Sequence, residues 1–154
     1  MPTWQDFAAA EPELADFAFE RLDERIAYLA TVTAEGAPRV HPVSPFIGAG
    51  RLFVYMEPTS PKVRDLERDA RYSLHCTVEN NDGGEGELSV SGRARVVLDP
   101  AQRALAFSTA REAGQSPLER YVVFELELER VMATTYAGGK PHRRRWASAA
   151  SGSP

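Results

Sequence analysis

The sequence predicts a mainly β fold, in which six antiparallel strands form a small closed or partly open barrel with short helices. Segments rich in β-branched and aromatic residues recur along the chain, and short turns separate them. Helical spacing of apolar residues is confined to the N-terminal segment and two short stretches, one after the third strand and one before the last. Short strands joined by tight turns are typical of small barrels.

The first 25 residues are predicted to be helical. Over residues 3–24, apolar side chains recur three and four positions apart, beginning with Trp4 and Phe7. Glu11 interrupts the pattern, and Pro12 suits the first turn of a second helix. Because the segment is rich in acidic residues, we expect its outer face to be solvated.

Three extended segments follow the helices. They span residues 26–33, 39–47 and 51–57. Because the turns between them are short, we expect the three strands to be neighbours in an antiparallel meander. Pro42 and Pro45 lie in the second segment, and each lacks the N–H that a ladder hydrogen bond needs. We therefore expect this strand to be irregular on one side, as strands often are where a ligand approaches.

The second half of the chain alternates strands with two short helices. Strands are predicted over residues 72–79, 87–98 and 121–136, and helices over residues 62–68 and 99–111. Thr59 or Ser60 precedes the first helix as a cap, and Asp99 with Pro100 suits the start of the second. Gly92 predicts a bend or a bulge within a long strand.

The last strand alternates acids with apolar residues, and a basic segment follows it. We expect the acids to mark the solvated face of the strand; they are Glu125, Glu127 and Glu129. Residues 140–146 form the basic segment, and the small residues over 147–154 predict a disordered tail. A single domain is therefore expected over residues 1–146.

The composition excludes several classes of protein. The chain has 154 residues, of which 43% are hydrophobic, enough for one globular core, and its net charge is −4. An acidic balance argues against nonspecific binding to nucleic acid. The N-terminus has no basic stretch followed by an apolar run, and no apolar stretch is long enough to span a membrane. We therefore expect a cytoplasmic protein.

The cysteine and histidine residues predict neither a disulfide nor a metal site. Cys76 is the single cysteine, and its neighbours suit a buried strand, so we expect a structural thiol. His41, His75 and His142 lack the spacing of metal ligands. We interpret His75 as an ordinary strand histidine.

A candidate anion site lies at Ser60-Pro61-Lys62, where a strand ends and a helix begins. A helix N-terminus presents unpaired backbone amides and a partial positive charge. A hydroxyl and an ammonium at this position suit a bound phosphate. Serine-capped helices with an early lysine are also common without any ligand.

Three stretches together resemble the flavin-binding split-barrel family of pyridoxamine 5′-phosphate oxidase. They are LATVTAEGAPRVHPV, LFVYMEPTSPKVRDL and SVSGRARV. No single stretch is diagnostic, and the resemblance rests on their order and spacing between Ile26 and Val97. It implies a split barrel that binds FMN, and a homodimer with two cofactor sites at the interface between its subunits.

The resemblance also implies a set of cofactor contacts. Ser60 and Lys62 match the family's phosphate-binding serine and lysine, and His41 takes the place of a phosphate-binding arginine. Tyr55 and Met56 match a strand-end pair that lies against the flavin. The other matched positions are Pro42, Val43 and Ser44 at the ring edge, Pro61 in place of a basic residue, Glu87 in place of a glutamine from the other subunit, and Trp146 for a C-terminal tryptophan near the ring.

The chain also departs from the oxidases themselves. The C-terminal Arg-Leu-x-Pro substrate motif is absent, so pyridoxamine phosphate is not the expected substrate. The resemblance implies an oxidoreductase that transfers hydride between bound FMN and a small conjugated substrate. The alternatives are a reductase that uses a deazaflavin coenzyme and a non-catalytic protein that binds flavin or haem. No side chain stands out as a general acid or base.

Simpler interpretations of the same residues stay open at this point. His41 is compatible with the surface of a strand, and Lys62 with the surface of a helix. The arginines at 143–145 either form a solvated segment or cover a phosphate or an acidic substrate, on the partner subunit if the protein is a dimer.

Overall fold

The structure is a computed structural model that describes residues 1–149. Its helices are α1 (Trp4–Ala10), α2 (Pro12–Leu22), α3 (Pro61–Arg68) and α4 (Pro100–Glu112). Its strands are β1 (Ala27–Val32), β2 (Pro38–Val43), β3 (Phe46–Gly48), β4 (Arg51–Met56), β5 (Arg71–Cys76), β6 (Glu87–Val96), β7 (Val122–Ala137) and β8 (Lys140–Ala147). The fold is therefore mainly β, as the sequence predicts, with eight strands in the described residues in place of the six expected.

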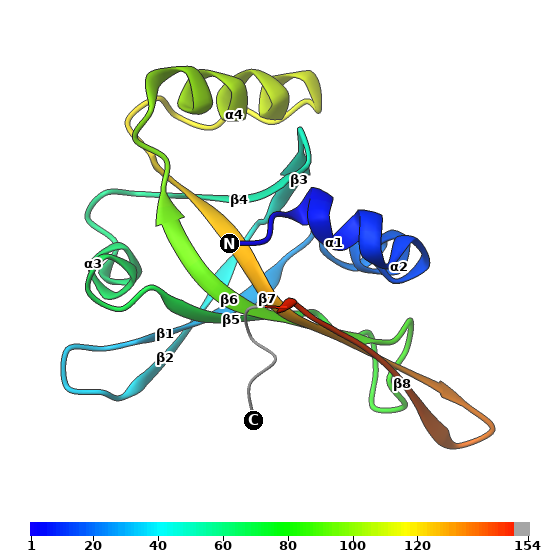
Figure 1. Ribbon diagram of the computed structural model, residues 1–154. Helices are drawn as coiled ribbons and strands as arrows, with labels where there is room; N and C mark the ends of the chain where they lie inside the picture. The colour runs from blue at the N-terminus through cyan, green and yellow to red at the C-terminus, as the bar shows by residue number, and fades with distance from the viewer. Residues whose placement is uncertain (150–154) are drawn as a thin grey trace.

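All the strand pairs in the described residues are antiparallel, and the sheet does not close. The hydrogen-bonding order is β2-β1-β5-β6-β7-β4-β3, and β8 also pairs with β7 (Figure 1). β7 joins the two halves of this open barrel: one of its edges pairs with β6 along most of its length, and the other pairs with β4 near the start of the strand and with β8 near its end. This split arrangement confirms the predicted fold class.

The predicted meander is wrong at its third strand. β1 and β2 form a hairpin, but β4 pairs with β3 and β7, far from β2 in the sheet. The segment over residues 39–47 divides because Pro45 has no N–H to continue the ladder. The N–H of Ile47 donates instead to the Asp23 carboxylate at 2.8 Å, which directs the chain toward the end of α2.

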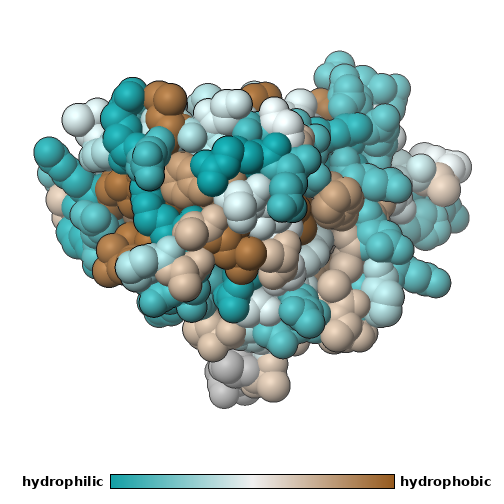
Figure 2. All heavy atoms as spheres, turned by 90° about the horizontal axis from the view of Figure 1, so that it is seen from above, coloured by the Kyte–Doolittle hydropathy of each residue, from teal (hydrophilic) through white to brown (hydrophobic). Residues whose placement is uncertain are grey.

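Two apolar clusters fill the space between the sheet and the helices. The larger lies beneath α1, α2 and α3 and includes Phe7, Leu22 and Leu66, all buried. The smaller, which includes Phe107, lies beneath α4. Seen from above, the surface is mostly hydrophilic, with apolar side chains in small separate groups (Figure 2). None of the helices in residues 1–149 is long and apolar enough to cross a membrane.

The predicted helix signals are confirmed. α1 and α2 are separated at Glu11, and Pro12 begins α2. The Asp99 carboxylate accepts from the Gln102 N–H at 3.0 Å and so caps α4. Side-chain caps of this kind satisfy amides that have no partner within the helix.

One face of the sheet has no helix on it. Helices α1, α2 and α3 lie on the same side of β1, β5 and β6, and no described helix covers the other side (Figure 1). The strand registers place a row of side chains on that uncovered side: Tyr28, His75, Ser89, Met132 and Arg145. The neighbouring row is Val40, Ala30, Ser73, Ser91, Arg130 and Ala147. We call this surface the open face.

The basic segment near the C-terminus is a strand, which the sequence pattern did not predict. β7 and β8 form a hairpin whose two-residue turn is Gly138-Gly139, with φ of +60° and +72°. Order extends past residue 146: Ala147 belongs to β8, and the buried Ser148 donates its N–H to the Glu129 carbonyl at 2.8 Å. The predicted disorder is therefore wrong at 147 and 148, and residues 150–154 lie outside the described residues.

The prediction that Glu125 faces solvent is also wrong. Its residue is 1% exposed, and its carboxylate accepts hydrogen bonds from Arg51 at 2.7 and 2.8 Å and from Arg95 at 2.6 Å. Glu125 pairs with Phe53 of β4 in the register, so the second half of the barrel covers it. Alternation along a strand identifies two faces but does not say which face another strand will cover.

Candidate functional site

The N-terminus of α3 is open to a ligand. β4 ends at Met56, and Pro61, whose fixed φ suits the first turn, begins the helix. Ser60 takes the N-cap position, as predicted, but its hydroxyl makes no capping bond and accepts from the Lys62 ammonium at 2.9 Å instead. The first turn therefore keeps its partial positive charge without a side-chain cap.

Lys62 is a cation without a counterion. Its side chain is half-buried, and the Ser60 hydroxyl is its one hydrogen-bond partner within residues 1–149. No carboxylate of those residues lies within ion-pair distance of it. Burial lowers the pKa of Lys62 below the ordinary value of lysine. A partly desolvated ammonium of this kind gains most from an incoming anion.

His41 contributes a buried nitrogen atom that has no hydrogen-bond partner. It pairs with Leu29 in the register of β1 and β2, on the side of the sheet that faces the core. Its Nε2 is buried and unpaired. Burial and the positive charges of Lys62 and Arg39 lower the pKa of His41. The imidazole is therefore neutral at pH 7, and it offers an anion a hydrogen bond without a charge.

Asp65 does not neutralise this positive region because its carboxylate is already fully engaged. It accepts from the Thr31 hydroxyl at 2.8 Å and from Arg39 and Arg68 at 2.9 Å each. Burial opposes its ionisation, but these hydrogen bonds and charges hold the pKa of Asp65 below its ordinary value. The cluster fixes α3 against β1 and β2, and so holds Lys62 near His41.

The side chains of Tyr55 and Met56, at the end of β4, pack inside the protein. The Tyr55 hydroxyl donates to the Ala106 carbonyl at 2.8 Å, its ring contacts Phe107 edge-on, and burial raises its pKa to about 12. Met56 and Val43 are buried in the larger core. Their side chains are therefore not gathered around Lys62.

The remaining predicted contacts lie elsewhere. Pro42 and Ser44 are exposed near the end of β2, with Pro42 on the edge strand. Glu87 begins β6 and accepts from the Tyr136 hydroxyl at 2.6 Å, on the open face. The Trp146 ring packs against Phe7, with centroids 5.1 Å apart. Along the sheet, five strand spacings separate β8 from β2, about 24 Å. One protomer therefore brings Ser60, Lys62 and His41 together but leaves Trp146 and Glu87 apart from them.

Sequence reasoning missed the Arg39–Asp65 cluster. Arg39 and His41 are two residues apart on one strand and so share a face, which was a usable signal. The contact from Asp65 to Thr31 joins residues 34 positions apart, and no local pattern predicts it.

Cys76 is a buried residue of β5, and its thiol has a hydrogen-bond partner. Cys76 is buried, as predicted for a structural thiol, and its sulfur accepts from the Leu88 N–H at 3.2 Å. Within residues 1–149, no three side chains of histidine, cysteine, aspartate or glutamate come together as metal ligands could.

The sequence matches the model of one known protein family. Residues 11–135 match the family model described as pyridoxamine 5′-phosphate oxidase. No curated protein matches the sequence.

Solved structures share the fold at low identity. A heme binding protein from Mycobacterium smegmatis has a TM-score of 0.64 and 18% identity, over 86% of this chain and 56% of that one. A conserved hypothetical protein from Mycobacterium tuberculosis has a TM-score of 0.62 and 23% identity, over 80% and 82%. An F420 reductase has a TM-score of 0.56 and 17% identity, over 73% and 94%. At these identities the likeness is one of fold.

Proposed function

The chain belongs to the pyridoxamine 5′-phosphate oxidase family, and from this premise we propose that it is a flavin-nucleotide-binding oxidoreductase. The proposed cofactor is FMN, and the proposed reaction is hydride transfer to or from a small conjugated substrate other than pyridoxamine phosphate. The proposal rests on one observation. The Lys62 ammonium, which has no counterion, lies near the buried Nε2 of His41, which has no hydrogen-bond partner.

These residues fit a phosphate. The Lys62 ammonium supplies charge and donors, and the Ser60 hydroxyl, which accepts from Lys62, keeps its own proton to donate. The His41 nitrogen supplies a further hydrogen bond, and the N-terminus of α3 adds a partial positive charge. Charge-assisted hydrogen bonds to an ionised group are the strong ones in proteins. A phosphate would satisfy groups that the protein alone leaves unpaired.

When bound, FMN supplies the hydride chemistry, and the protein supplies placement and electrostatics. The Asp65 cluster holds Lys62 and His41 in position before the ligand arrives. We assign no catalytic acid or base to this chain.

Replacing Lys62 with methionine is expected to weaken FMN binding by about 10- to 100-fold, because a charge-assisted hydrogen bond contributes about 1.5–3 kcal/mol. Methionine keeps the stem and removes the charge. Quenching of flavin fluorescence during titration measures the affinity. Riboflavin, which lacks the phosphate, should bind both proteins equally well.

Arg64→Met is the matched control, because it removes an exposed charge from the same helix. We expect its FMN affinity to stay within about twofold of wild type. An equal loss of FMN and riboflavin affinity in Lys62→Met would contradict the phosphate assignment. Wild-type protein that binds neither flavin would refute the proposed cofactor.

A deazaflavin coenzyme or haem is the second candidate ligand. The observation in its favour is that proteins described as an F420 reductase and a heme binding protein share the fold. Titration with FMN, reduced deazaflavin and haemin, followed by absorbance, ranks the three. Reduction of the bound flavin by a nicotinamide cofactor then separates an enzyme from a non-catalytic binder.

We also propose that two copies of the chain form a homodimer through the open face. Its exposed apolar residues include Tyr28, Val40 and Met132, which are 45%, 61% and 38% exposed. In a single protomer Trp146 lies on β8, at the opposite end of this run of strands from His41 on β2, and its ring packs against Phe7. A second copy could bring these residues to the cofactor.

A charge placed on this face should separate the subunits. Tyr28→Glu is expected to weaken dimerisation by at least about tenfold in sedimentation velocity, because it buries a carboxylate without a partner. Leu118→Glu is the control, since Leu118 is 44% exposed in the segment after α4. Wild-type protein that sediments as a monomer would contradict the proposal.

A further inference from the structure

His41 differs from the other members of the proposed phosphate site because its reacting atom is shielded from water. The Nε2 atom is buried on the core-facing side of β2 and has no hydrogen-bond partner in the described residues. A buried polar atom without a partner costs free energy, so a ligand that bonds to it gains that cost back. The charge of the Lys62 ammonium acts on the same imidazole. An anion bound at this place would contact both groups.

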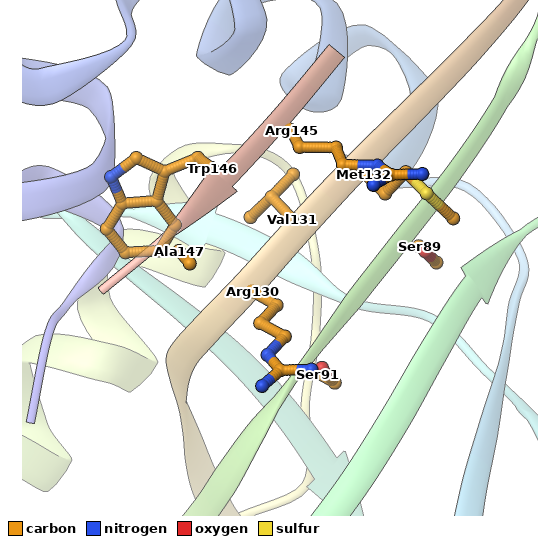
Figure 3. A pocket seen from close by; sticks show the side chains of 8 residues that line it. All are labelled: Ser89, Ser91, Arg130, Val131, Met132, Arg145, Trp146 and Ala147. Carbon is orange, nitrogen blue, oxygen red and sulfur yellow. The ribbon is translucent and has the colours of Figure 1, made fainter. Parts of the chain in front are cut away.

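Arg130 and Arg145 also lack an acidic partner in the part of the chain that the structure describes, but their setting is different. Both lie on the open face, where they are exposed in the single protomer (Figure 3). Water solvates an exposed guanidinium, and arginine keeps its proton at every ordinary pH. A histidine gains or loses a proton near pH 7. The charge of the phosphate site therefore depends on the state of His41, whereas the charge of the open face is fixed.

Charged groups act on His41 from α3 and from its own strand. Lys62 and Asp65 belong to α3, and Arg39 lies two residues away on the same face of β2. β1, which pairs with β2 beside His41, has no charged residue. Burial and the charges of Lys62 and Arg39 lower the pKa of His41, and Asp65 opposes them as the weakest influence. The ring is therefore neutral at pH 7 before a ligand arrives.

We propose that His41 takes up a proton when a phosphate monoester binds beside Lys62. The neutral imidazole and a proton from solvent give an imidazolium, so two positive charges face a phosphate with nearly two negative charges at pH 7. An opposite charge within about 4–6 Å favours the charged form of a titratable group. The imidazolium carries a proton on each ring nitrogen, so Nε2 donates to the phosphate whichever tautomer is present beforehand. The inference rests on the proposed function, because FMN ends in a phosphate monoester.

This proton makes the affinity for FMN depend on pH. The pKa of His41 is low in the free protein and higher in the complex. The added affinity is therefore complete below the free value and is lost as the pH rises through the value in the complex. The phosphate of FMN is almost fully ionised between about pH 7 and 8.5, so its own titration contributes little. Burial also lowers the pKa of Lys62, and a variant without His41 retains that contribution.

The test compares calorimetric titrations of wild type, His41→Gln and His41→Arg with FMN. At about pH 7.5, buffers of different ionisation enthalpy should show that wild type takes up about 0.3–1 proton per FMN and that neither variant takes up any. Between about pH 7 and 8.5, the affinity of wild type relative to His41→Gln should fall by about threefold or more. His41→Arg carries a permanent charge, so its affinity should stay nearly constant over this range. His142→Gln removes an exposed histidine of β8 and should behave like wild type.

Proton NMR observes the same event directly in wild type. The ring signal of His41, identified by its absence from His41→Gln, should move to the imidazolium position when FMN is added at about pH 7.5 and stay in place with riboflavin. FMN binding without proton uptake, with a His41 signal that stays neutral, would overturn the inference and leave the proposed function standing. Equal proton uptake by His41→Gln would also overturn it, because another group would then take the proton. Wild type that does not bind FMN would refute both proposals. Circular dichroism checks that each variant is folded.

Discussion

Replacing Gly92 with alanine is expected to lower the free energy of unfolding by about 3 kcal/mol, the upper end of what overpacking costs. A Cβ at this position would lie 1.9 Å from the Glu127 carbonyl oxygen and 3.0 Å from its carbonyl carbon. These are backbone atoms of the neighbouring strand, which cannot move without breaking the pairing of β6 with β7. Urea denaturation monitored by tryptophan fluorescence measures the loss.

Gly36→Ala provides the matched control, because it separates steric crowding from backbone conformation. Gly36 has a φ of +83° and open space around it, so alanine there suffers only from the left-handed backbone. We expect a loss of about 1 kcal/mol. The φ of Gly92 lies outside the left-handed region, so its effect is purely steric. A smaller loss at Gly92 than at Gly36 would contradict this account.

The irregularity at Gly92 also decides which side chains reach the open face. Ser91 pairs with Arg130, and Gly92 pairs with Leu128, so β7 carries one extra residue, Glu129, at this point. Leu128 faces the core before the extra residue, and Val131 faces it afterwards. Because side chains alternate along a strand, one added residue exchanges the two faces. Without it, Arg130 would face the core.

Features that depend on residues close together in the sequence could be predicted. Helix caps, the break at Glu11 and the irregularity at Gly92 each depend on one or two neighbouring residues. The hairpin that makes β8 also had a local signal, because Gly138-Gly139 suits a two-residue turn with positive φ. The strand itself could not be predicted, because arginines lie on both of its faces and the sequence shows no alternation of apolar and polar residues there.

Contacts between distant segments were the part that sequence patterns could not predict. The family resemblance predicted that Ser60, Lys62 and His41 share one site. In the structure the Lys62 ammonium donates to the Ser60 hydroxyl and its charge acts on His41, and their binding of a cofactor stays a prediction. The carboxylate that holds α3 in place, Asp65, was not predicted. The pairing of β4 with β7 was not predicted either, and the burial of Glu125 follows from it.

The acids and arginines of this chain divide into engaged and free groups, and the division indicates function. Asp65 and Glu125 each bind two arginines, so those arginines are structural. Lys62, Arg130 and Arg145 have no acidic partner within residues 1–149. At Lys62 the free charge lies beside the buried His41 Nε2, which has no hydrogen-bond partner, and this combination is what indicates an anion site.

Replacing Glu125 with alanine is expected to cost about 3 kcal/mol of unfolding free energy. Breaking a buried ion pair from one side typically costs 3–5 kcal/mol. Here the lower end applies, because the side chains of Arg51 and Arg95 keep 34% and 40% of their exposure and water can solvate them in part. The loss should reach the proposed phosphate site only weakly, since Asp65 holds Lys62 and His41 in position.

Glu57→Gln tests whether burial causes the effect. Glu57 pairs with Arg120 at the surface, where the two side chains are 42% and 62% exposed. Water screens exposed ion pairs, so this variant should unfold at nearly the same urea concentration as wild type. Urea denaturation of both variants gives the comparison, and Glu125→Gln shows how much a neutral isostere recovers. If Glu57→Gln and Glu125→Ala destabilise the protein equally, burial is not the reason that Glu125 matters for stability. The pairing of β4 with β7, which buries Glu125, would then not explain the loss.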